Sequence, residues 1–105
     1  MAREVSIDEL ETAVSAGSFV LDVREDWEYE AGHVPTARHM PLSTVPDRIA
    51  EIPKDELVWV ICQAGGRSMK AADYLEAQGY SVVSVGGGTG SWIQSGKPVS
   101  MEANK

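Results

Sequence analysis

Short apolar runs alternate with segments of helical periodicity along this chain, and this alternation restricts the fold more than any other feature. The clearest runs, residues 19–23, 57–61 and 82–85, are nearly continuous in apolar side chains, as in strands covered on both faces. Helical segments separate these runs, and no β-hairpin dipeptide joins them. The pattern predicts an α/β fold with β-α-β crossovers and a mostly parallel sheet.

Local signals mark where the elements begin and end. Ser6 is followed three residues later by Glu9, which is the capping-box pair of a helix start. Pro53 and Gly79 are expected to stop later helices. The expected strands cover residues 4–6, 19–23, 37–40, 57–61 and 82–85, and the expected helices cover 7 until Gly17, 26–31, 43–51, 67 or 68 until Gly79, and 89–94.

Length and composition indicate one globular domain over residues 1–105, with a frayed tail at 100–105. The net charge of −7 argues against nucleic acid and anionic lipid as partners. The start of the chain is too acidic for a signal peptide, and no apolar stretch is long enough to span a membrane. One cysteine cannot form an internal disulfide, so a cytoplasmic protein is expected.

Cys62, that single cysteine, directly follows the apolar run 57–61. In open α/β sheets, sites form outside the carboxyl ends of the strands, and a helix is expected to begin at Arg67 or Ser68. Backbone N–H groups and a helix N-terminus both stabilise a thiolate and an attached anion. A small buried hydrophobic residue is the alternative interpretation, but the glycine-rich loop favours a chemical role. The candidate site consists of catalytic Cys62 and a substrate-binding loop of Gln63, Ala64, Gly65, Gly66, Arg67 and Ser68.

The composition of the loop predicts the pKa of the Cys62 thiol and the roles of the residues around it. Its pKa should lie below the free value of about 8.5, because several N–H donors outweigh burial by the apolar strands. Gly65 and Gly66 are expected at positive φ, where the backbone curls closely around an anion. Arg67 either adds a positive field or ties down the loop, and Ser68 either acts in the site or caps the helix.

Other polar and aromatic residues favour structural roles. Arg24 and Glu28 are expected to form an ion pair, and His33 is expected to bind backbone. The two histidines are too few for a metal site, and no cofactor is expected. Trp59 and Trp92 are assigned to packing, and residues 86–88 to a tight turn beside the Cys62 loop.

The chain resembles the single-domain rhodanese family over nearly its whole length. The resemblance implies a five-stranded parallel sheet flanked by helices, and a cysteine that carries a sulfane sulfur as a persulfide. Thr36 stands where the family commonly has glycine, and Gln63 stands where a basic residue often follows the cysteine, which weakens the case for thiosulfate as the natural donor. The matching segments are Leu21 to Glu25, Glu28-Tyr29, Gly32 to Pro35, Ala37, the Cys62 loop through Arg67-Ser68, Ala71-Ala72, Leu75, Gly79-Tyr80, Val85 to Gly88, Gly90 to Trp92 and Lys97-Pro98.

The length of the Cys62 loop distinguishes sulfur transfer from phosphatase or arsenate reductase chemistry. From Cys62 to Arg67 the spacing is Cys-x4-Arg, whereas protein phosphatases and the related arsenate reductases use Cys-x5-Arg. The shorter loop forms a tighter ring of donors, which suits one terminal sulfur better than a tetrahedral oxyanion.

Three functional classes follow. The first is a sulfurtransferase that moves sulfane sulfur from thiosulfate or a persulfide to cyanide or a thiol through a Cys62 persulfide. The second is a persulfide carrier that delivers sulfur to a protein partner. The third, which the loop length disfavours, is a phosphatase or arsenate reductase. The expected partners are a small anionic sulfur donor and a thiol or cyanide acceptor, which can be a thiol protein.

Overall fold

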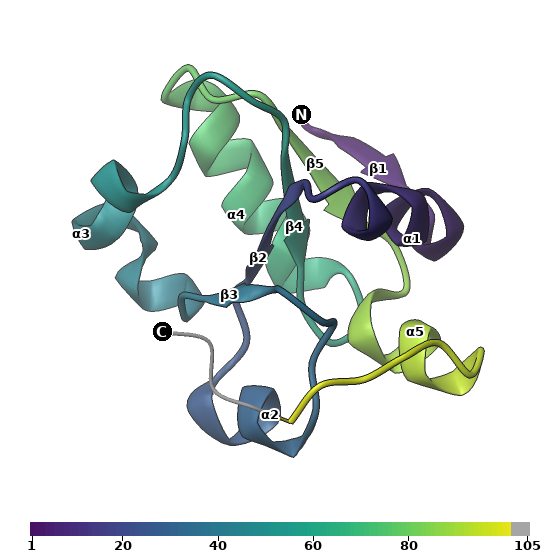
Figure 1. Cartoon of the computed structure of the whole chain (residues 1–105). Helices are drawn as coiled ribbons and strands as arrows, with labels where there is room; N and C mark the ends of the chain where they lie inside the picture. Colours follow the sequence, from purple (N-terminus) through teal and green to yellow (C-terminus); the bar gives the residue numbers. More distant parts are fainter. Residues whose placement is uncertain (102–105) are drawn as a thin grey trace.

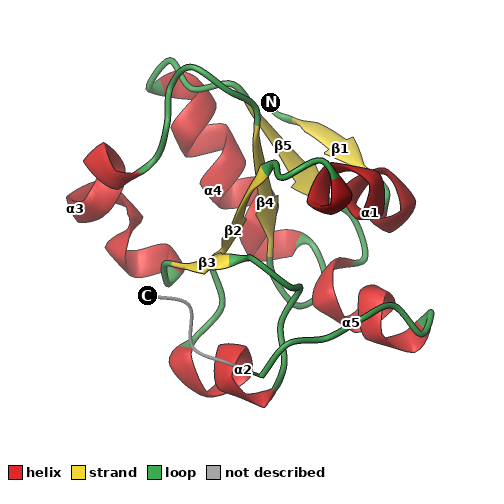
Figure 2. Cartoon of the chain, in the orientation of Figure 1, coloured by secondary structure: helices red, strands yellow, loops and turns green. Residues whose placement is uncertain are grey.

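The computed structural model describes residues 1–101, and these residues form a five-stranded parallel sheet with helices on both faces (Figures 1 and 2). The strand order is β1-β5-β4-β2-β3, and every neighbouring pair is parallel. The predicted fold class is therefore confirmed. The strands are β1 (Arg3–Val5), β2 (Phe19–Asp22), β3 (Arg38–His39), β4 (Val58–Ile61) and β5 (Val82–Val85).

Five α-helices connect and cover the strands. They are α1 (Ile7–Ser15), α2 (Asp26–Ala31), α3 (Val45–Arg48), α4 (Gly66–Ala77) and α5 (Gly88–Gln94). The predicted capping box starts α1, because the Ser6 side chain accepts from the Glu9 backbone N–H and the Glu9 carboxylate accepts from the Ser6 N–H.

Alternation along β4 divides the core into two clusters. Val58, Val60 and Cys62 face one side and pack with residues of α3 and α4. Ile61 faces the other side, where residues of α1 and α5 complete the second cluster. Side chains of a strand alternate between faces, so a central parallel strand must be apolar at successive positions. Trp59 is only half-buried, but it packs against the second cluster as expected.

The expected single helix over residues 43–51 is wrong. The structure has a 3₁₀ turn at Leu42–Thr44, the short α3, and a second 3₁₀ turn at Ile49–Glu51. Pro46 has no N–H to donate to the preceding turn. The Thr44 N–H and hydroxyl both bind the Pro41 carbonyl oxygen, at 2.8 and 2.7 Å, which tightens the start of this segment.

The expected frayed tail began at residue 100, but Ser100 is held by hydrogen bonds in the structure. Ser100 exchanges two backbone hydrogen bonds with His33, of 2.8 and 2.9 Å, in an isolated antiparallel bridge. The remainder of the expected tail, residues 102–105, lies outside the described residues. Within residues 1–101, no helix is long and apolar enough to cross a membrane.

Candidate active site

Cys62 lies at the carboxyl edge of the sheet, directly after the central strand β4. Its neighbours in the sheet are β2, which leads into Arg24, and β5, which leads into Gly86. Parallel strands all end at the same edge, so three segments far apart in the sequence meet around one sulfur.

The Cys62 sulfur contacts two backbone N–H groups and one hydroxyl of the loop and helix that follow it. Sγ lies 3.1 Å from the Gly65 backbone nitrogen, 3.2 Å from the Ser68 backbone nitrogen and 3.5 Å from Ser68 Oγ. Gly65 has φ +115°, which turns the chain back toward the sulfur and starts α4 one residue later. The structure thus places α4 at Gly66, one residue before the predicted start.

Two opposing effects act on the Cys62 pKa. Burial raises it, because only 1% of the residue is exposed. Hydrogen bonds from the Ser68 hydroxyl and from the backbone N–H groups of Ser68, Gly65 and Ala64 lower it, and together they outweigh burial. The Cys62 pKa is therefore lower than the usual value for a thiol, in the direction predicted from the sequence.

Ser68 contacts the Cys62 sulfur and does not cap the helix. The helix N-cap is Gly65, and Ser68 lies in the first turn. Ser68 Oγ also lies 2.8 Å from Ser84 Oγ and 3.1 Å from the Gly65 carbonyl oxygen. Ser84 was not predicted from the sequence. The available signal was a hydroxyl in the otherwise apolar strand β5, where a fully buried polar group needs a partner.

Arg67 is bound to Glu28 of α2 rather than to the sulfur. Nη1 and Nη2 of Arg67 donate to the two carboxylate oxygens of Glu28 at 2.7 and 2.9 Å. This bidentate pair raises the pKa of Arg67 and, chiefly through the Arg67 hydrogen bond, lowers the pKa of Glu28 to about 2. Of the two roles that the sequence suggested for Arg67, these contacts fit the one in which it holds the loop in place.

The predicted Arg24–Glu28 ion pair is wrong. Arg24 instead binds Asp22, which has no exposed surface, with Nη2 2.9 Å from Oδ2. The same guanidinium donates to the Gly32 carbonyl oxygen at 2.8 Å and to Gln63 Oε1 at 3.1 Å. Arg24 therefore connects the end of β2 to the first residue after Cys62.

The turn of Gly86 and Gly87 after β5, together with the first residues of α5, packs against the Cys62 loop, where a tight turn of residues 86–88 was predicted. The Thr89 and Gly90 N–H groups donate to the carbonyl oxygens of Cys62 and Gln63 at 2.8 and 3.0 Å. Gly88 has φ +59°, and a Cβ there would lie 2.7 Å from the Gln63 carbonyl carbon and would collide with the Cys62 carbonyl oxygen. Only glycine allows this approach.

The other loop residues differ in their surroundings. Gln63, Ala64 and Gly66 are exposed, and Arg67 is half-buried. Gly66 does not have the expected positive φ, because it is already the first residue of α4, and nothing lies within 4 Å of a Cβ built there. Only Gly65 of this pair needs the freedom of glycine.

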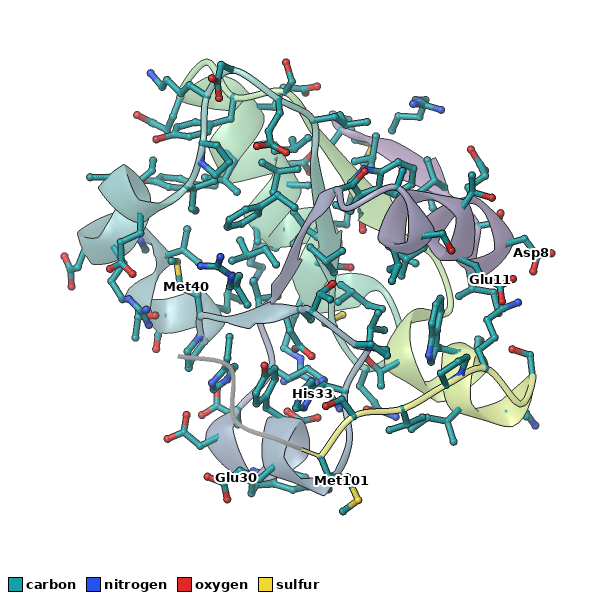
Figure 3. The ribbon with its side chains drawn as sticks, in the orientation of Figure 1. Asp8, Glu11, Glu30, His33, Met40 and Met101 are labelled. Atoms are coloured by element: carbon teal, nitrogen blue, oxygen red, sulfur yellow. The ribbon has the colours of Figure 1, made fainter. Side chains whose placement is uncertain are left out.

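The remaining candidates have structural contacts. His33 Nδ1 donates to the Tyr29 carbonyl oxygen at 2.8 Å, and its side chain lies between α2 and the sheet (Figure 3). Trp92 is buried and its Nε1 donates to the Pro98 carbonyl oxygen at 2.6 Å, which confirms packing. Among residues 1–101 no group of three or more histidine, cysteine, aspartate or glutamate side chains is arranged to hold a metal ion.

Fold and loop geometry define a parallel α/β protein with a donor-ringed cysteine loop at the carboxyl edge of its sheet. The model of the rhodanese-like domain family matches residues 6–95, and the chain belongs to this family.

Two relatives and one solved structure show how far the likeness extends. A sulfurtransferase of Allochromatium vinosum is 35% identical over 102 residues, which are 94% of this chain and 95% of the relative. The thiosulfate sulfurtransferase GlpE of Pseudomonas putida is 39% identical over 84 residues, covering 79% of this chain and 76% of the relative. The crystal structure of a rhodanese-related protein from Thermoplasma volcanium has a TM-score of 0.89 at 34% identity and covers 95% of this chain and 99% of that one. These names support a rhodanese-like sulfurtransferase.

Proposed function

We propose that this chain transfers sulfane sulfur through a persulfide formed on Cys62. The observation that carries the proposal is the environment of Sγ, which accepts from two backbone N–H groups at 3.1 and 3.2 Å, lies 3.5 Å from the Ser68 hydroxyl oxygen, and has a lowered pKa. A thiolate is the nucleophilic form of cysteine, so contacts that lower the Cys62 pKa favour the form that attacks a sulfur donor.

The first half-reaction loads the cysteine. With thiosulfate as donor, the Cys62 thiolate attacks the outer sulfur, the donor S–S bond breaks, and sulfite leaves with the electron pair of that bond. The product Cys62–S–S⁻ carries the negative charge on the terminal sulfur. The Gly65 and Ser68 N–H groups contact Sγ, and loop N–H groups that reach the terminal sulfur would stabilise its charge by about 1.5–3 kcal/mol per charge-assisted bond.

The second half-reaction discharges it. Cyanide or a thiolate attacks the terminal sulfur, the Cys62 S–S bond breaks, and the Cys62 thiolate returns. A cyanide acceptor becomes thiocyanate and a thiolate acceptor becomes a persulfide. No proton transfer is required in either half, so the site needs no general acid.

The nearby carboxylates fit this mechanism better than phosphate-ester hydrolysis, which needs an acid for its leaving group. Asp22 is held by Arg24, and Glu28 has a pKa of about 2 and is ionised at neutral pH. The Glu28 carboxylate is therefore not available as a proton donor. This supports sulfur transfer over the phosphatase alternative.

Intact mass spectrometry tests the proposal. After incubation with thiosulfate or a small-molecule persulfide, the wild type should gain the mass of one sulfur atom and Cys62→Ser should gain none. Cyanide should then remove the added mass and yield thiocyanate. Equal gain by both proteins, or no gain with any donor, would exclude a Cys62 persulfide. Loading without turnover on cyanide or simple thiols would instead identify a carrier that needs a protein acceptor.

A further inference from the structure

The two guanidinium groups beside the Cys62 loop, those of Arg67 and Arg24, each form an ion pair with a carboxylate. Arg67 uses Nη1 and Nη2 on the Glu28 carboxylate, at 2.7 and 2.9 Å. Arg24 uses Nε and Nη2 on Asp22, at 2.9 to 3.1 Å, and its remaining contacts are to the Gly32 and Gln63 oxygens. Each positive charge is therefore balanced by a carboxylate in contact with it.

Further carboxylates lie on both sides of the loop. Glu25, at the start of α2, is exposed and interacts electrostatically with Arg67. On the β1 side, a hollow of about 410 Å³ is lined by Glu4, Glu9 and the glycines Gly86 and Gly87. Gly87 also borders the loop, because its backbone nitrogen would lie 3.6 Å from a Cβ on Gly65.

Lys70, the first basic residue after Arg67 on α4, does not contribute to the surroundings of the Cys62 loop. Lys70 lines a groove of about 200 Å³ between α4 and the segment that holds Leu42, Val45 and Pro46. The surroundings of the sulfur site are thus balanced by ion pairs and bordered by carboxylates. The guanidinium groups of Arg67 and Arg24, which lie beside the loop in the described part of the chain, are both paired, so neither offers an uncompensated charge to an approaching donor.

We propose that Glu28 is a specificity-determining residue that selects the charge of the sulfur donor. By holding Arg67 it selects against small polyanions such as thiosulfate and favours a persulfide carried by a thiol of neutral or positive charge. The inference rests on the proposed function, since it concerns the loading of the same Cys62.

The chemistry of such a donor balances without a further reagent. The Cys62 thiolate attacks the outer sulfur of R–S–SH, the S–S bond of the donor breaks, and R–S⁻ leaves with the electron pair. Cys62 takes the outer sulfur with its proton as Cys62–S–SH, and loss of that proton to solvent gives the same Cys62–S–S⁻ that thiosulfate produces. Thiosulfate would bring two negative charges toward a thiolate and several carboxylates, whereas this donor brings none or a positive one.

Three small donors that differ in charge test the proposal. They are the persulfides of cysteamine, mercaptoethanol and mercaptopropionate, which carry a positive, a neutral and a negative group, with thiosulfate as a fourth donor. The rate of sulfur addition to Cys62 is measured by intact mass at low and high salt. The leaving thiols differ in intrinsic reactivity, so absolute rates are not compared between donors. The measured quantity is the change in the ratio of donor rates with salt and between variants.

In the wild type, the preference for the cysteamine over the mercaptopropionate donor should fall about threefold or more as salt screens the carboxylates. Glu28→Gln frees the Arg67 charge while retaining an oxygen that accepts the Glu25 N–H. It should shift preference toward thiosulfate and the mercaptopropionate donor by about threefold or more at low salt. Glu51→Gln removes the carboxylate of another arginine ion pair, Arg48–Glu51, and should leave donor preference unchanged.

The outcomes separate this inference from the function it rests on. If Cys62 gains sulfur but donor preference is equal in wild type and Glu28→Gln, the selection role of Glu28 is overturned while the transferase remains. If no donor adds sulfur, the proposed function itself fails. Should Glu28→Gln not fold, Arg67→Gln tests the same pair: it leaves the Glu28 carboxylate unpaired and should shift preference toward the cysteamine donor at low salt, and an unchanged preference would overturn the role.

Discussion

At the scale of single residues, the Cys62 sulfur is the point where burial and hydrogen bonding compete. Burial of a thiol disfavours the thiolate, and donors at contact favour it. Ser68 contributes a backbone donor and a hydroxyl, and the hydroxyl is supported by Ser84 at 2.8 Å. The balance toward thiolate should therefore depend on the Ser68 side chain.

Ser68→Ala is expected to raise the Cys62 pKa by about one pH unit, because one charge-assisted hydrogen bond is lost while burial is unchanged. Sulfur uptake at neutral pH should fall, and its pH profile should move toward higher pH. Thiolate ultraviolet absorbance against pH measures this directly, since the chain has one cysteine. Ser84→Ala should shift the midpoint in the same direction by less, and exposed Ser43→Ala should not shift it. An unchanged midpoint in Ser68→Ala would show that the backbone donors alone set the pKa.

Thr36 is a second residue whose conformation has an energetic consequence. It is the only non-glycine residue among 1–101 with positive φ, at +72°. The Ala37 N–H donates to the Val34 carbonyl oxygen at 3.1 Å, so Pro35 and Thr36 occupy the central positions of a β-turn. A turn with proline first and positive φ second is of type II, which favours glycine or asparagine at the position of Thr36. Thr36 therefore holds a strained backbone conformation that glycine would adopt freely.

Thr36→Gly is expected to increase the free energy of unfolding by about 0.5–1 kcal/mol, because relief of strain exceeds the added entropy of the unfolded chain. Urea unfolding measures the change. The same substitution at Thr12, in the middle of α1, should destabilise by about 1 kcal/mol, since glycine weakens a helix interior. Destabilisation at both positions would contradict strain at Thr36.

At the scale of elements, the turn between β5 and α5 supports the Cys62 loop through close backbone contact. Gly88 and Gly96 both have positive φ, at +59° and +81°, but only Gly88 has protein atoms near a built Cβ. The pair therefore separates the cost of backbone conformation from the cost of a steric clash.

Gly88→Ala should lower the free energy of unfolding by about 3 kcal/mol or more and should slow sulfur uptake, because the Cys62 carbonyl must move. Gly96→Ala should cost about 1 kcal/mol, from backbone strain alone. Denaturant unfolding of both variants measures the difference. Equal losses would mean that the turn yields easily and does not hold the loop.

Elements were predictable where one local pattern determines them. The strand at β4 and the helix α2 follow from apolar runs and from Gly32, and both lie within one residue of their expected bounds. The sequence did not predict the segment at 43–51 correctly. Pro46 fits the first turn of a helix whether or not the helix continues, so it does not show where the helix ends.

At the scale of the whole molecule, parallel topology predicts that the ends of β2, β4 and β5 share one edge, and thus where the site lies. Topology does not predict which charges pair there. Arg67 and Glu28 are 39 positions apart, and the sequence equally allowed the shorter-range pair of Arg24 with Glu28. Similarly, Ser84 reaches Ser68 only because β5 lies beside β4. Such choices depend on side-chain geometry across the sheet, which periodicity does not contain.

The kinetic competence of the Cys62 persulfide tests the central claim most directly. The loaded protein is separated from its donor and mixed rapidly with cyanide, and thiocyanate release is compared with steady-state turnover under the same conditions. The account predicts a single-turnover rate at least as fast as kcat, with the loss of one sulfur mass from Cys62 at the same rate. Release slower than kcat, or turnover that persists in Cys62→Ser, would contradict a Cys62 persulfide as the intermediate of sulfur transfer.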